Sequence, residues 1–287
     1  MASTIVETLT SSTRYASPPS YDLSQQEIER LKIWVNYSFA AYRVTGKQDP
    51  ENHRVLPKCQ YTKNGLIRFT FVHDDDPSVG GFMAVDHSQR AIVLSFKGTV
   101  VQSKFESVIK FHKTRWPPGE ESKVYLGALQ GYQQVNTKIF ALHEQLHRQY
   151  PAYTSYIVGH SMGGVHAIFY ATEFQGRIPT MKFEVVTFAM PKPGDGNFAA
   201  LWNRKNIPLT QVNNFADLIP HLPPDLLKYQ YLAPPIVVDP ENNRTVPCNI
   251  AVASYDTLCT HKPSPGYHAS AHSSFWGEDG SVFGPKV

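Results

Sequence analysis

Residues 156–164 read Tyr-Ile-Val-Gly-His-Ser-Met-Gly-Gly, and this stretch decides the fold. A short apolar run ends at Gly159, Ser161 follows, and a helix-like run continues over residues 165–174. This is the G-x-S-x-G pattern, in which a strand turns sharply into a helix and presents the serine. Gly159 and Gly163 lack the β-carbons that would clash across such a turn. The pattern therefore predicts a strained, nucleophilic Ser161, with the free amides of the new helix aimed at developing negative charge.

Outward from this stretch, expected strands alternate with expected helices. Strands are expected at about Ile67–Val72, Gly81–Asp86, Ala91–Phe96, Phe183–Ala189, Leu209–Asn213 and Tyr231–Val238, and helices at Ser24–Tyr42, Leu126–Gln149 and Asn197–Arg204. The alternation predicts one α/β domain over residues 24–287, with a mostly parallel central sheet flanked by helices. Residues 1–23 are rich in Ser, Thr and Pro, and we expect a flexible N-terminal segment there.

The composition excludes several classes of protein. With 41% hydrophobic and 18% charged residues, the 287-residue chain is globular rather than disordered. A net charge of +3 without a long Lys/Arg run speaks against a nucleic-acid partner. No apolar run approaches the ~18 residues that cross a bilayer. The N-terminus also lacks the basic start and apolar core of a signal peptide. We therefore expect no transmembrane segment, and a cytoplasmic protein as the chain stands or a secreted one if this is a mature form.

The cysteines show no metal-binding spacing. No CxxC pattern occurs, and we expect no metal and no organic cofactor. Cys248 and Cys259 can close a small loop and leave Cys59 free, or all three can remain buried thiols.

A nucleophilic serine needs a histidine base, which a carboxylate holds in the right tautomer. On α/β-hydrolase sheets the order along the chain is serine, acid, histidine. Asp217 is the favoured acid, because it follows an expected strand at a sheet edge and lies among apolar and proline residues. Asp195 is its rival, but the glycines beside it suggest an exposed turn. The candidate bases are His261, His268 and His272.

Six stretches, in this order, resemble the class 3 lipases, the fungal triacylglycerol-lipase-like α/β hydrolases. They are residues 93–99, 123–127, 156–164, 187–191, 217–224 and 272–276, and the likeness runs from about Gly81 to Trp276. The resemblance implies an α/β-hydrolase fold with Ser161 as nucleophile, Asp217 as acid and His272 as base. It favours His272 because family members carry an aromatic pair three and four residues after the base. Ala271 stands where the family often has Asp, and Lys97 where Arg is commoner.

Two further features concern the oxyanion hole and a lid. The amide of Met162, directly after the nucleophile, is the first expected oxyanion donor. The resemblance places the second at Thr99, after a buried strand and Gly98. It also implies a movable lid over about residues 100–117, whose apolar face would consist of Phe105, Val108 and Ile109.

The sequence thus predicts a serine hydrolase that cleaves carboxylic esters through an acyl-enzyme. The favoured substrate is an acylglycerol, with transient contact to a lipid interface. One alternative is a feruloyl or short-chain carboxylesterase that acts on soluble substrates. The other is a non-catalytic lipid-binding protein of the same fold, since a fold does not fix function.

Overall fold

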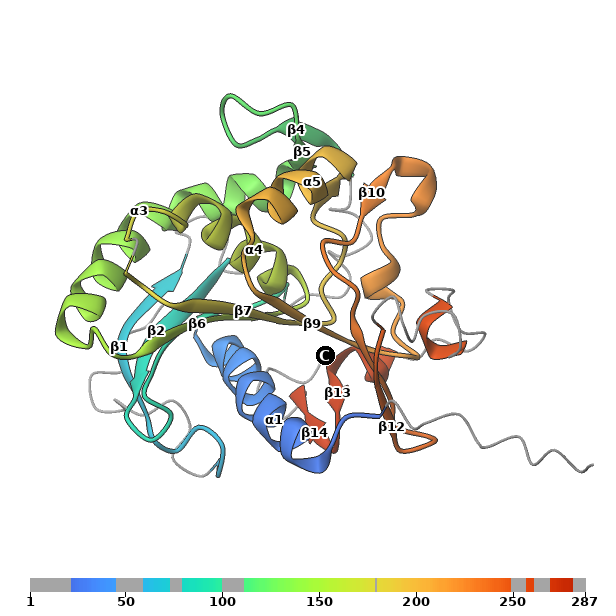
Figure 1. The fold of residues 1–287 in the computed structure, drawn as a ribbon, viewed down its shortest axis with the longest axis horizontal. Coiled ribbons are helices and arrows are strands. Elements are labelled where there is room, and N and C mark those ends of the chain that lie inside the picture. Colours follow the sequence, from blue (N-terminus) through green and yellow to red (C-terminus); the bar gives the residue numbers. More distant parts are fainter. Residues whose placement is uncertain are drawn as a thin grey trace, which may run out of the picture.

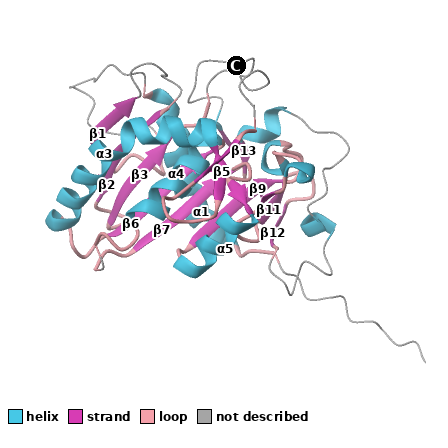
Figure 2. Cartoon of the chain, turned by 90° about the horizontal axis from the view of Figure 1, so that it is seen from above, coloured by secondary structure: helices cyan, strands magenta, loops and turns pink. Residues whose placement is uncertain are grey.

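The central sheet brings distant parts of the chain side by side. The computed structural model describes residues 22–44, 59–72, 79–99, 111–178, 180–248, 257–260 and 269–280. Within these residues eight strands form one sheet in the order β1-β2-β3-β6-β7-β9-β11-β12 (Figures 1 and 2). They span Gly65–Val72, Gly80–Asp86, Ala91–Phe96, Thr154–His160, Phe183–Phe188, Leu209–Asn214, Ile236–Asp239 and Arg244–Pro247. The pairs from β3 to β11 are parallel and the outer pairs antiparallel, which confirms the predicted mostly parallel sheet.

Helices cover both faces of this sheet. The helices α3 (Leu126–Gln149), α4 (Met162–Phe174) and α5 (Gly196–Lys205) pack on one face, and α1 (Gln25–Ala40) on the other (Figure 1). Side chains of β3 alternate between the two layers: Ile92, Leu94 and Phe96 join the α3/α4 layer, whereas Ala91 and Val93 join the α1 layer. This period of two explains why β3 reads as a continuous apolar run, since both of its faces are buried.

Helix α1 begins where the sequence predicts and continues as a tighter turn. Ser24 caps it, because the Glu27 amide donates to the Ser24 hydroxyl at 3.3 Å and the Ser24 amide donates to the Glu27 carboxylate at 2.8 Å. The α-helix ends at Ala40, and a 3₁₀ turn, η1 (Ala41–Arg43), follows it. The predicted helix is therefore confirmed, with its last turn wound more tightly. Tyr42 lies on that turn.

A second, antiparallel sheet departs from the sequence expectations. Its order is β10-β8-β5-β4, from Tyr229–Gln230, Gly194–Asp195, Lys123–Tyr125 and Lys113–Arg115. The strand expected over 231–238 is wrong in extent, because only its residues from Ile236 onward form a strand, β11, which belongs to the central sheet. The lid expected over about residues 100–117 includes Lys113–Arg115, which form β4 of the second sheet. Asp195 is not a free turn residue: its carboxylate accepts the amides of Phe198 at 3.0 Å and Lys123 at 3.1 Å and so caps α5.

The C-terminal part is tied to the sheet by a disulfide. Cys248, after β12, is bonded to Cys259 on the 3₁₀ turn η4 (Thr257–Thr260), and their Cα atoms are 5.3 Å apart. Cys59 is a free, partly buried thiol. Cross-linking a loop of this size stabilises a fold by about 3 kcal/mol. Among the helices described, none is long and apolar enough to cross a membrane.

The buried histidine of α3 makes stability depend on pH. His143 is fully buried, with Nδ1 2.7 Å from the Tyr170 hydroxyl and Nε2 2.7 Å from the Ser155 hydroxyl. Burial, and secondarily the charge of His147, lowers the pKa of His143 from 6.5 to about 3. The native ring therefore stays neutral between these values while the unfolded ring gains a proton.

We expect His143 to make the free energy of unfolding fall as the pH drops from 6.5 towards 3. Its share of the slope approaches ~1.4 kcal/mol per pH unit. Urea unfolding of the parent and of His143→Gln at several pH values between 7 and about 4 measures this, because glutamine cannot titrate. The variant should be less stable at pH 7 and show a shallower decline. Parallel curves would contradict the assignment.

Candidate active site

The strand-to-helix turn holds Ser161 in a backbone conformation that few residues adopt. Ser161 joins β6 to α4 with φ 57° and ψ −131°, and its amide donates to the Phe188 carbonyl at 2.8 Å. A β-carbon on Gly159 would lie 2.3 Å from the Gly163 carbonyl carbon, and one on Gly163 would lie 2.3 Å from the Phe96 oxygen. Only glycine therefore fits at both positions. The packing of β3, β6 and α4 maintains the strain at Ser161.

The expected oxyanion residues lie beside this serine. Met162 is the first residue of α4, where helix amides have no partner within the helix. On the other side of Ser161 lies Gly98, two residues after the end of β3. A β-carbon on Gly98 would be 2.9 Å from the Ser161 β-carbon. Thr99 comes next and is partly buried. The structure thus brings the segments of Met162 and Thr99 to Ser161 from two directions.

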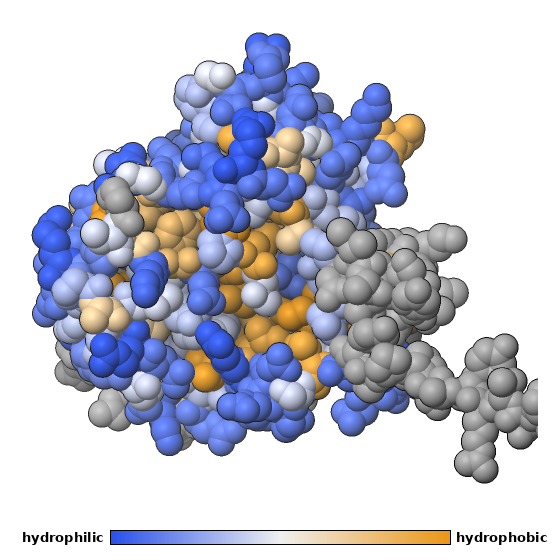
Figure 3. All heavy atoms as spheres, in the orientation of Figure 1, coloured by the Kyte–Doolittle hydropathy of each residue, from blue (hydrophilic) through white to orange (hydrophobic). Residues whose placement is uncertain are grey.

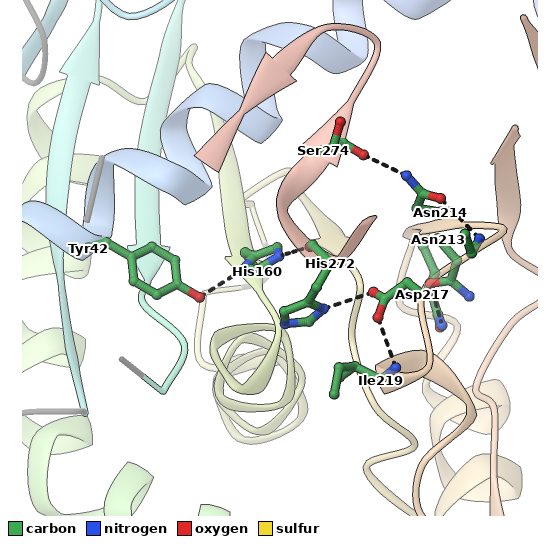
Figure 4. A network of polar contacts seen from close by, with 10 residues as sticks. Tyr42, His160, Asn213, Asn214, Asp217, Ile219, His272 and Ser274 are labelled. Atoms are coloured by element: carbon green, nitrogen blue, oxygen red, sulfur yellow. Dashed lines mark hydrogen bonds and ion pairs between the residues drawn. The ribbon is translucent and has the colours of Figure 1, made fainter. Parts of the chain in front are cut away.

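Asp217 and His272, which are 55 residues apart, form a hydrogen-bonded pair. The distance from His272 Nδ1 to Asp217 Oδ2 is 2.8 Å (Figure 4). Asp217 is 1% exposed, and its other oxygen accepts the Ile219 amide at 2.9 Å. Because a buried carboxylate needs such donors, this environment fixes both its position and its orientation. The Asn214 side chain donates to the Ser274 carbonyl at 2.8 Å and ties the two segments together.

The aromatic pair after His272 anchors its segment. Phe275 is fully buried against Phe188 and Phe39, with ring centroids 5.5 and 6.4 Å apart. The indole of Trp276 donates to the Thr245 hydroxyl at 2.9 Å. These contacts lie directly after the turn η5 (Ala269–Ser273), which carries His272.

Asp195, the rival acid, and two further aspartates that follow Ser161 in the chain are engaged elsewhere. Asp195 caps α5, as described above. Asp225 pairs with Lys192 at 2.6 Å, and Asp239 accepts amides of its own turn. Asp256, the rival bases His261 and His268, and the expected lid residues Phe105, Val108 and Ile109 lie outside the described residues.

Two residues that the sequence did not single out form a chain of hydrogen bonds that ends at the candidate base. His160 Nε2 lies 2.6 Å from the His272 carbonyl oxygen, and His160 Nδ1 lies 2.7 Å from the Tyr42 hydroxyl (Figure 4). The position of His160 directly before the nucleophile could have indicated that it lies at the site. Tyr42 reads as part of the apolar stripe of α1, and nothing in its spacing indicates a polar contact. Among the residues described, no group of three or more His, Cys, Asp or Glu side chains is placed to hold a metal ion.

Comparison with known proteins gives consistent similarities. The model of the family "Lipase (class 3)" matches residues 93–227. The secreted mono- and diacylglycerol lipase A of Penicillium cyclopium is 25% identical over 244 residues, which cover 81% of this chain and 78% of the relative. A lipase of Rhizomucor miehei is 26% identical over 212 residues, covering 72% and 57%.

A solved structure shares the whole architecture. The native Rhizomucor miehei lipase propeptide complex superposes with a TM-score of 0.78 at 24% identity, over 92% of this chain and 86% of that one. The predicted α/β-hydrolase fold is thereby confirmed, as is the resemblance to class 3 lipases.

Proposed function

Since the chain belongs to the class 3 lipases, which are carboxylic ester hydrolases, we propose that it cleaves acylglycerol esters through an acyl-enzyme on Ser161. The observation that carries this proposal is the bond between His272 and the buried Asp217, close to the Ser161 turn. A carboxylate that accepts the Nδ1 proton of a histidine leaves its Nε2 free to act as a base.

In the proposed reaction, Ser161 Oγ attacks the carbonyl carbon of the ester while His272 Nε2 takes the hydroxyl proton. The amides of Met162 and Thr99 stabilise the oxyanion of the tetrahedral intermediate. The C–O bond to the alcohol then breaks, and the alcohol leaves with the proton from His272. Water repeats the sequence on the acyl-enzyme: it loses a proton to His272, and the carboxylic acid and the free Ser161 hydroxyl are released.

The surface supports a lipid substrate over a soluble ester. Figure 3 shows hydrophobic residues in a band across one face of the molecule, bordered by hydrophilic ones. Leu218, directly after Asp217, is 41% exposed, and Leu226, further along the same connection, is 89% exposed. An exposed apolar side chain directly after the candidate acid suits contact with a lipid surface. The named activity of the Penicillium relative, on mono- and diacylglycerols, agrees with this choice.

We also propose that the protein acts outside the cell. The Cys248–Cys259 disulfide is typical of an oxidising compartment, and the Penicillium relative is a secreted lipase.

A serine-directed phosphonate tests the proposed chemistry. We expect it to label the parent at Ser161, found by peptide mass spectrometry, and to leave Ser161→Ala unlabelled. The untreated parent should cleave emulsified long-chain diacylglycerol faster than a soluble short-chain ester or a feruloyl ester. Activity confined to the soluble esters would favour the esterase alternative. An unlabelled parent without activity on any ester would favour a non-catalytic lipid-binding protein.

A further inference from the structure

A chain of hydrogen bonds reaches the candidate base from the side opposite Asp217. It joins Tyr42 on η1 to His160 at the end of β6 and then to the backbone of His272, across 118 and 112 residues of sequence. Figure 4 shows His272 between His160 and Asp217, with bonds on both sides. The His160 ring is 3% exposed, and its centroid lies 4.6 Å from that of the His272 ring.

The chemistry of the partners fixes the direction of every bond in this chain. The His272 carbonyl can only accept, so His160 Nε2 carries the proton. Burial, and then the charge of His272, hold the pKa of His160 well below its ordinary value, so the ring is neutral and Nδ1 accepts. Tyr42 therefore donates its hydroxyl proton to Nδ1, and its oxygen lies against Gly98, where a β-carbon would be 2.3 Å from it.

We propose that Tyr42 and His160 are positioning residues, which hold His272 and the oxyanion segment at Thr99 in register with Ser161. This rests on the proposed function. Asp217 orients the His272 ring, whereas His160 fixes the backbone from which that ring projects. The Tyr42 hydroxyl packs against Gly98, one residue before Thr99. Tyr42 and His160 thus link the base, the residue before the nucleophile and the oxyanion segment by two hydrogen bonds and one close packing contact.

Two further contacts support this arrangement. The Lys97 ammonium donates to the Val44 carbonyl at 2.9 Å, so a second bond joins the end of η1 to the same strand end. A β-carbon on Gly98 would lie 2.3 Å from the Tyr42 hydroxyl and 2.8 Å from the His160 oxygen, so the segment is packed without slack. A neutral His160 also does not repel the positive charge that forms on His272 during the reaction. A positively charged His160 ring at this distance would repel it.

The chain contains a matched control for Tyr42. Tyr170 also places its hydroxyl 2.7 Å from Nδ1 of a fully buried, neutral histidine, but that histidine is His143 in the core. Tyr42→Phe and Tyr170→Phe therefore remove the same bond, one beside the candidate base and one away from it. Both should lower the melting temperature, because each leaves a buried ring nitrogen without its hydrogen-bond partner.

Catalysis should separate the two variants. We expect Tyr42→Phe to lower kcat about 10- to 100-fold and to change KM less than about threefold, with kcat calculated per active site titrated by the phosphonate. Small displacements of catalytic groups lower reaction rates by factors of this size. Tyr170→Phe should keep kcat within about twofold. Titration of active sites removes any contribution from unfolded protein. If the parent is active and reacts with the phosphonate, but the two variants have equal kcat values, the positioning role is overturned and the proposed function still stands.

Variants of His160 test the other half of the chain. Glutamine can still donate an amide proton to the His272 carbonyl and accept from Tyr42, whereas leucine can do neither. We expect His160→Gln to retain at least about ten times the kcat of His160→Leu. Equal kcat values for the two would overturn the role of this bond.

The proton pattern can be checked without reference to catalysis. In ¹⁵N spectra of the histidine-labelled parent, His160 should be neutral with its proton on Nε2. A charged ring, or a proton on Nδ1 alone, would overturn the inference even in an active enzyme. A parent that neither hydrolyses esters nor takes the phosphonate would instead remove the proposed function, and the positioning role with it.

Discussion

Replacing Ser161 by alanine is expected to lower kcat on ester substrates on the order of 10⁴-fold or more. The substitution removes only the hydroxyl group, and without it no acyl-enzyme forms. The only contribution to catalysis that would remain is stabilisation of the transition state by the oxyanion groups. The fold should survive, because the strained turn is held by the Ser161 amide and by the packing of Gly159 and Gly163, which the substitution leaves in place. Initial rates and thermal unfolding of parent and variant measure both effects.

Ser155 supplies the control for this experiment. It lies on the same strand, β6, is buried, and has its hydroxyl 2.7 Å from Nε2 of His143. It therefore forms a serine–histidine pair, but at the other end of the strand. We expect Ser155→Ala to lose stability and to keep its kcat. Near-normal hydrolysis by folded Ser161→Ala would contradict the nucleophile assignment, and a comparable loss in Ser155→Ala would show that the effect is not specific.

The strongly patterned elements of this fold could be predicted from the sequence. Strands β2, β3, β6 and β7 are rich in apolar residues and buried in the sheet, and the observed bounds of these strands and of β9 lie within about two residues of those expected. The strands of the second sheet could not be found, because two or three residues show no periodicity. Residues of β4 are also polar, Lys113-Thr-Arg115, and only their pairing with β5 defines a strand. Asp195 was misjudged partly for the same reason: besides capping α5 locally, its carboxylate accepts the Lys123 amide of β5, a contact that no local pattern records.

The site divides in a similar way. Ser161 and Met162 follow from a local pattern, because the strand, the turn and the helix are contiguous. Asp217 follows from its place after a strand, and His272 required a family resemblance. Tyr42, His160 and Asn214 act through contacts between segments 60 to 118 residues apart, and no local pattern records such contacts.

The geometry around Asp217 makes Asp217→Asn a sharper test than removal of the side chain. One carboxylate oxygen accepts the Ile219 amide at 2.9 Å and the other faces His272 Nδ1 at 2.8 Å. An asparagine can satisfy the Ile219 amide only with its carbonyl oxygen, so its NH₂ group turns towards Nδ1. Nδ1 must then accept, and the ring proton moves to Nε2. His272 would then have no lone pair with which to take the Ser161 proton.

We therefore expect Asp217→Asn to lower kcat on the order of 10⁴-fold, with little change in KM. Asp86→Asn is the matched control, because Asp86 is equally buried at 1% exposure and accepts the Tyr37 hydroxyl at 2.7 Å. Asp86 lies beside the start of β3, at the sheet edge opposite Ser161, and should affect stability alone. In ¹⁵N spectra the His272 proton should move from Nδ1 to Nε2 in Asp217→Asn. A variant that keeps the proton on Nδ1 and most of its activity would mean that another acid serves His272.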